Sequence, residues 1–139
     1  MRKTVSIALL AASAAAFVPA VAAQAFPLGG PQLAQRVHNG EFRGYTRTSR
    51  GFENQIWHFR PDGYIRAVAD ARVLRWPNTD ENLQWQDIGT WRLTAGQVCV
   101  SFQGPNRTLD GCYAVSAGPG KQVRLIGRYT WEGTLEPHD

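Results

Sequence analysis

Apolar and polar residues alternate along the chain from residue 51 onward, a pattern typical of strands with one buried face. Segments rich in Gly, Pro, Asn or Asp interrupt the alternation about every 8 to 12 residues, as they do in meandering antiparallel sheets. The sequence therefore predicts an all-β fold, a small antiparallel meander that forms either a closed barrel or a curled sheet. The expected strands are 52–59, 64–74, 87–93, 97–103, 112–116 and 122–131.

The first two expected strands are joined by Arg60-Pro61-Asp62-Gly63, whose proline and glycine suit a type I turn in a hairpin. The stretch 64–74 has apolar residues at both strand and helical spacing, and we favour a strand because the turn before it has hairpin composition. Alternation in the preceding strand places its side chains on two faces: Trp57 and Phe59 on one, Ile56 and His58 on the other.

A short helix is expected before the strands. Pro31 suits the first turn of a helix, and Leu33 and Val37 follow four residues apart, which places them on one face. The helix should end near Asn39-Gly40 and cover one end or edge of the sheet. The segment 25–31 before it is rich in Gly and Pro and has little preference for helix or strand.

The first 25 residues have the composition of a secretory signal peptide. Arg2 and Lys3 precede an uncharged apolar stretch that is shorter than the roughly 20 residues of a membrane span, and small residues follow it. Cleavage after Ala23 and cleavage after Ala25 both fit the rule of small residues at the cut, and we favour the second. We therefore expect a signal peptide at 1–25, a single β-rich domain at 26–139 and no transmembrane segment, in a periplasmic or secreted protein.

The two cysteines are expected to pair in the oxidising compartment that export implies. If Cys99 lies opposite Cys112 in an antiparallel pair, Val98 faces Tyr113 and Val100 faces Gly111, which gives one consistent apolar face. Closing this loop should stabilise the fold by about 3 kcal/mol. The cysteine spacing fits no zinc motif, and the three histidines are scattered along the sequence, so no metal site is predicted.

Charge gives little indication of a nucleic-acid partner. The formal net charge is +4, and it falls by two to +2 when Arg2 and Lys3 are removed with the signal peptide. A nucleic-acid-binding surface usually needs a larger basic excess. We therefore expect no nucleic-acid partner.

The longest polar interruption, 75–86, is the first candidate for a functional site because long loops often carry function. It holds Trp76 and Trp85, and Arg72 and Arg75 lie close by in the sequence. These residues would suit an aromatic platform for a sugar ring or a cation–π clamp. The alternative is that one or both tryptophans fold inward as a lid, because large aromatic area usually serves a core or an interface.

Catalysis has weaker support. No serine lies in a G-x-S-x-G motif, and His58 is the one histidine inside an expected strand, so a hydrolase would have to use His58 with an acid that the spacing does not select. We expect a non-enzymatic domain without a cofactor that binds an envelope component or a protein partner. The alternative is a lipocalin-like barrel that holds a hydrophobic ligand, with room left by the small residues Ala67, Ala69 and Ala71.

Three short motifs give the chain a resemblance to a family of small exported bacterial proteins of unknown function. The motifs are FRPDGYI at 59–65, GTWRLTAGQVCVSF at 89–102 and GCYAV at 111–115. The resemblance implies a periplasmic all-β domain and no activity. The motif Gly89-Thr90-Trp91 is also similar to the G-x-W motif of lipocalin-like barrels, which place it nearer the start of the chain.

Overall fold

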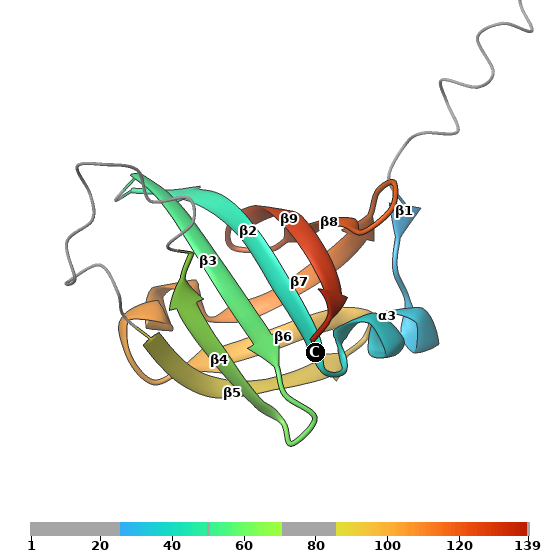
Figure 1. Ribbon diagram of the computed structural model, residues 1–139, viewed down its shortest axis with the longest axis horizontal. Coiled ribbons are helices and arrows are strands. Elements are labelled where there is room, and N and C mark those ends of the chain that lie inside the picture. The colour runs from blue at the N-terminus through green and yellow to red at the C-terminus, as the bar shows by residue number, and fades with distance from the viewer. Residues whose placement is uncertain (1–25, 50, 71–85, 139) are drawn as a thin grey trace, which may run out of the picture.

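The computed structural model describes residues 26–49, 51–70 and 86–138. Within these residues, eight antiparallel strands form a closed barrel, to which a ninth short strand and one helix are added (Figure 1). The added elements are β1 (Phe26–Pro27) and α3 (Gly30–Val37). The barrel strands are β2 (Gly40–Thr48), β3 (Gly51–Phe59), β4 (Tyr64–Ala69), β5 (Gln86–Thr94), β6 (Gln97–Phe102), β7 (Gly111–Ala117), β8 (Gln122–Ile126) and β9 (Thr130–Pro137).

Each barrel strand pairs with the next one in the sequence, and β9 closes the ring by pairing with β2. The closing register places Phe42 opposite Leu135 and Gly44 opposite Gly133. Strand β1 pairs with β7 next to β6. Closure satisfies the backbone groups that an open sheet would leave at its edges, so the meander forms a barrel and not a curled sheet.

Aromatic side chains fill the interior of the barrel. Trp57 is fully buried at the centre, and its ring lies 5.0–6.3 Å, between centroids, from five other aromatic rings. These rings belong to Phe42, Phe59, Phe102, Tyr113 and Trp131. Edge-to-face and tilted pairs of this kind contribute about 0.5–1.5 kcal/mol each beyond the area that they bury.

The two ends of the barrel are covered differently. Helix α3 buries Leu33 and Val37 at the end where β2 begins, as the sequence predicts for its short helix. At the other end lies a 3-10 helix, η2 (Pro105–Leu109), in place of a simple turn. The carboxylate of Asp87 accepts hydrogen bonds from the backbone N–H groups of Ile88, Gly104 and Asn106 there, at 2.8–2.9 Å.

The disulfide is confirmed in the predicted register. Cys99 lies opposite Cys112, with Val98 opposite Tyr113 and Val100 opposite Gly111. The face prediction for β3 is also confirmed, since Trp57 and Phe59 are buried and the side chains of the other face are partly exposed.

Three parts of the strand prediction are wrong. The expected strand 122–131 is two strands, because the chain reverses at Gly127, whose N–H donates to the carbonyl of Tyr129. Strand β2 is missing from the prediction because its inward positions carry only one large apolar residue. These positions are Gly40, Phe42, Gly44 and Thr46. Strand β1 also lies in a segment with no predicted strand preference.

Candidate functional site

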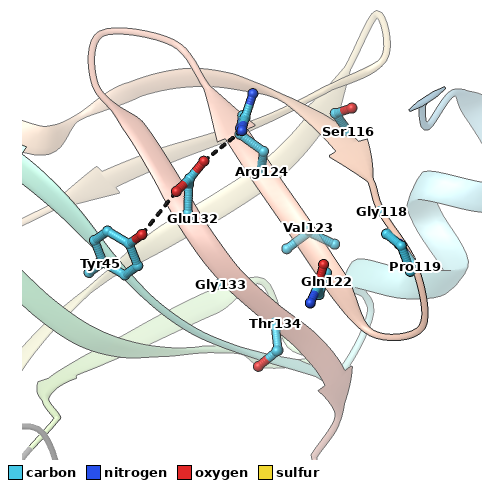
Figure 2. Close-up of a pocket in the computed structure, with 10 residues that line it drawn as sticks. All are labelled: Tyr45, Ser116, Gly118, Pro119, Gln122, Val123, Arg124, Glu132, Gly133 and Thr134. Carbon is cyan, nitrogen blue, oxygen red and sulfur yellow. Dashed lines mark hydrogen bonds and ion pairs between the residues drawn. The ribbon is translucent and has the colours of Figure 1, made fainter. Parts of the chain in front are cut away.

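The tryptophan loop of the sequence analysis lies outside the described residues. This holds for Trp76 and Trp85 and for the two nearby arginines, Arg72 and Arg75. A different site stands out on the described surface. It is a groove of about 460 Å³ on the outside of the barrel, between Tyr45 of β2, the β8–β9 hairpin and the β7–β8 turn (Figure 2).

The groove is formed where three strands place outward-facing side chains in one row. The register pairs Tyr45 with Glu132 across β2 and β9, and Arg124 with Glu132 across β8 and β9. Cross-strand neighbours in such positions have their side chains within contact distance. Further polar side chains line the groove: Ser116, Gln122 and Thr134.

The carboxylate of Glu132 is the centre of this row. One of its oxygens accepts a hydrogen bond from Arg124 Nη2 at 2.6 Å, and the other accepts one from the Tyr45 hydroxyl at 2.9 Å, as the dashed lines in Figure 2 show. The Tyr45 hydrogen bond, followed by the hydrogen bond and charge of Arg124, lowers the pKa of Glu132. The same carboxylate raises the pKa of Tyr45. Glu132 is therefore ionised at neutral pH and the Tyr45 hydroxyl is protonated.

This arrangement leaves hydrogen-bonding capacity for a ligand. A carboxylate has about four lone-pair sites, and Glu132 uses one on each oxygen. A guanidinium has five N–H donors, and Arg124 uses one of them for Glu132. Both groups can therefore form further hydrogen bonds to a ligand. The Tyr45 side chain is 43% exposed. Next to it, Phe52 is 61% exposed, with ring centroids 6.3 Å apart, and the Arg47 guanidinium lies 4.4 Å from the centre of the Phe52 ring. The site thus combines aromatic surface with fixed donors and acceptors.

His58, the catalytic candidate of the sequence, lies on the outer face near the C-terminus. Its Nε2 is 2.9 Å from the side-chain oxygen of Asn39, and its ring stacks on that of His138 with centroids 3.7 Å apart. The carboxylate in this group, Glu41, lies 3.2 Å from Nδ1 of His138. Among the described residues, His58 contacts an amide and not an acid, so they provide no acid–histidine pair for a hydrolase that uses His58.

The histidine stack leads to a pH-dependent stability. Burial, then the charge of His138, lowers the pKa of His58, while Glu41 acts in the opposite direction. Between this lowered value and the ordinary value of about 6.5, the unfolded chain binds a proton that the folded chain does not. The stabilisation is therefore fully present above about pH 6.5 and is lost as the pH falls through this window.

We expect the melting temperature to fall as the pH is lowered from 7.5 through this window, and His58→Gln to flatten that dependence. His38→Gln is the matched control, because His38 is exposed at the end of α3. Differential scanning calorimetry across the pH range measures both. An equal slope in the His58→Gln variant and in the unaltered protein would show that the stack does not carry the effect.

Other kinds of site have less support in the described residues. Within residues 26–49, 51–70 and 86–138, no three His, Cys, Asp or Glu side chains are grouped as metal ligands. For the alternative of a hydrophobic ligand inside the barrel, the structure shows that Trp57 packs among five aromatic rings there and that Ala67 is fully buried. No helix in the described part of the chain is long and apolar enough to cross a membrane.

Comparisons with protein-family models, with curated protein sequences and with solved structures found no match to this chain. The resemblance to small exported bacterial proteins therefore stays a prediction from its short motifs. The groove residues escaped the sequence analysis because two of them, Tyr45 and Glu132, lie on β2 and β9, the strands that close the barrel. They are 87 positions apart, and no local pattern brings them together.

Proposed function

We propose that this protein is an exported, non-enzymatic β-barrel that binds a carbohydrate of the cell envelope in the groove beside Tyr45. The observation that carries the proposal is the row of Tyr45, Glu132 and Arg124 across three strands. The composition of the first 25 residues and the pairing of both cysteines support the export part of the proposal.

The chemistry of the groove matches a sugar better than an apolar ligand. Sugar hydroxyls both donate and accept hydrogen bonds, and Glu132 and Arg124 offer an acceptor and donors that are fixed by their own contact. The C–H face of a pyranose ring packs on an aromatic side chain, which the exposed ring of Tyr45 provides. Sites of this type orient a ligand by a few placed polar groups.

The test is titration of the isotope-labelled, disulfide-bonded protein with fragments of envelope polysaccharide, followed by amide NMR shifts. We expect shifts in β8, β9 and the end of β2, and a loss of affinity of about tenfold or more in Tyr45→Ala, in line with the loss of a buried aromatic contact. Tyr64→Ala is the matched control, because Tyr64 is as exposed as Tyr45 but lies on β4.

Equal weakening by both tyrosine variants, or shifts confined to other strands, would contradict the proposed site. Shifts in the groove with an envelope protein and none with any sugar would replace the carbohydrate by a protein partner. The mass of the exported product tests the other half of the proposal, since it should begin at Gln24 or Phe26.

A further inference from the structure

The outer face of β4 and β5 combines arginines with exposed apolar side chains. The register places Arg66 opposite Ile88 and Tyr64 opposite Thr90, with Arg92 two residues further along β5. Tyr64 is 49% exposed and Ile88 is 46% exposed. Between them lies a hollow of about 270 Å³, which is also lined by Arg60 and Arg66.

This face is defined by Arg60, Tyr64, Arg66, Ile88 and Arg92, and among the described residues it has an excess of positive charge. Arg60 pairs with Asp62 at 2.6 Å. The Nε of Arg66 donates to the neutral amide oxygen of Gln86 at 3.1 Å, and neither Arg66 nor Arg92 forms an ion pair with a residue that the structure describes. The adjacent His58 has a lowered pKa and therefore adds little positive charge at neutral pH, and Glu41, which lies opposite it on β2, is paired with Arg43.

The opposite side of the barrel is different. There Lys121 pairs with Glu136 at 3.0 Å and Arg124 pairs with Glu132 at 2.6 Å. Strands four apart in an eight-stranded ring lie across from each other, and β8 and β9 accordingly lie across the barrel from β4 and β5 (Figure 1). Lys121 and Arg124 on that side are thus paired with carboxylates, whereas Arg66 and Arg92 form no ion pair with a described residue.

We propose that the β4–β5 face docks on the surface of a membrane that contains anionic phospholipids. Arginines attract the phosphate groups of such a surface, and their apolar stems pack beside the lipid. Tyrosine is favoured at the depth of the headgroups, and Ile88 projects from the same face to reach the boundary of the acyl chains. The excess charge and the two exposed apolar side chains thus meet the two requirements of reversible surface binding.

This orientation leaves the groove beside Tyr45 free. Because the groove is formed by β2, β8 and β9, a barrel that rests on β4 and β5 presents the groove to the aqueous compartment. Membrane docking and ligand binding are therefore compatible, and either one can be lost without the other.

The test is co-sedimentation of the full disulfide-bonded protein with vesicles of phosphatidylcholine alone and of phosphatidylcholine mixed with phosphatidylglycerol. We expect binding to the mixed vesicles, weakening as salt is added, and little binding to the neutral vesicles. The double variant Arg66→Gln/Arg92→Gln should bind about tenfold or more weakly. The double variant Arg107→Gln/Arg128→Gln has the same net charge, changes exposed arginines outside this face and should bind as the unaltered protein does.

Equal weakening by the two double variants would show that net charge alone acts and would overturn the proposal. So would a failure to bind the mixed vesicles, including the case in which the protein binds an acidic polypeptide instead. A second variant tests the apolar contribution: Tyr64→Ser/Ile88→Ser should weaken vesicle binding while the slope of its salt dependence stays the same. An unchanged melting temperature in each variant shows that these losses do not come from unfolding.

Discussion

Replacing Asp87 with alanine should lower the free energy of unfolding by about 4 kcal/mol, because it leaves buried backbone N–H groups without an acceptor. Asp87 is 5% exposed, and its two oxygens accept three backbone hydrogen bonds that fix the start of β5 and the turn into η2. No other described side chain accepts from these donors. The change is measured by urea unfolding, followed by tryptophan fluorescence.

The effect should extend into the barrel. Asn106, which Asp87 holds through its backbone, donates at 2.8 Å to the side-chain oxygen of Gln55, and the same oxygen accepts from the indole N–H of Trp57 at 2.7 Å. Loss of the η2 turn removes one end of this chain and exposes the central tryptophan. We therefore expect the near-ultraviolet circular dichroism signal of the folded Asp87→Ala variant to decrease as well.

Asp62→Ala is the control for this prediction. Asp62 also accepts a backbone hydrogen bond, from Tyr64 at 3.1 Å, but it is exposed, and water replaces the lost acceptor. It should cost less than about 1 kcal/mol. If both aspartate variants unfold at the same urea concentration, the buried carboxylate does not hold the end of the barrel.

The middle of this fold could be predicted from the sequence because its strands have large apolar residues on one face. The assumption that Cys99 lies opposite Cys112 sets the register of β6 and β7, and parity supports it, since this register places Val98 and Tyr113 on the same apolar face. The hairpin at Asp62-Gly63 likewise has turn residues between two regular alternations. In these parts local composition and tertiary packing favour the same structure.

Closure of the barrel could not be predicted, because the closing strands do not carry that signal. Gly40, Gly44 and Gly133 occupy positions of β2 and β9 where apolar side chains would be expected. The ring of Phe42 takes the space instead, since a Cβ on Gly44 would lie 2.4 Å from its Cζ. The interior beside Gly44 is therefore filled by a neighbouring residue of the same strand, and the regular alternation of apolar residues is missing from the sequence of β2.

The candidate site depends on the same strands, so it could not be predicted either. Tyr45 and Glu132 become neighbours when β2 meets β9, a contact that no pattern within either strand specifies. Residue type alone selects every aromatic or charged residue as a candidate for binding, and on this criterion the tryptophans of the 75–86 loop are predicted. Closure of the barrel decides which aromatic and charged residues share a surface.

Replacing Gly133 with alanine should therefore disrupt both the fold and the groove. A Cβ at this position would lie 2.1 Å from the carbonyl oxygen of Arg43 and 2.6 Å from the Cα of Gly44, which are backbone atoms that a rotamer change cannot move. The strands β2 and β9 must separate to admit it. Overpacking against backbone costs about 3 kcal/mol, and we expect a loss of that size in urea unfolding.

Separation of β2 from β9 also makes two open strand edges, which pair with other chains. Gel filtration should therefore show dimers or larger species for Gly133→Ala. Gly29→Ala is the matched control, because no atom lies within 4 Å of its new Cβ and it is outside the groove, so it should elute as the unaltered protein does and lose little stability. If Gly133→Ala is as stable as Gly29→Ala and binds envelope sugar normally, Tyr45 and Glu132 do not need a close β2–β9 contact. Loss of stability together with loss of sugar binding, while Gly29→Ala retains both, would indicate that closure of the barrel assembles the site.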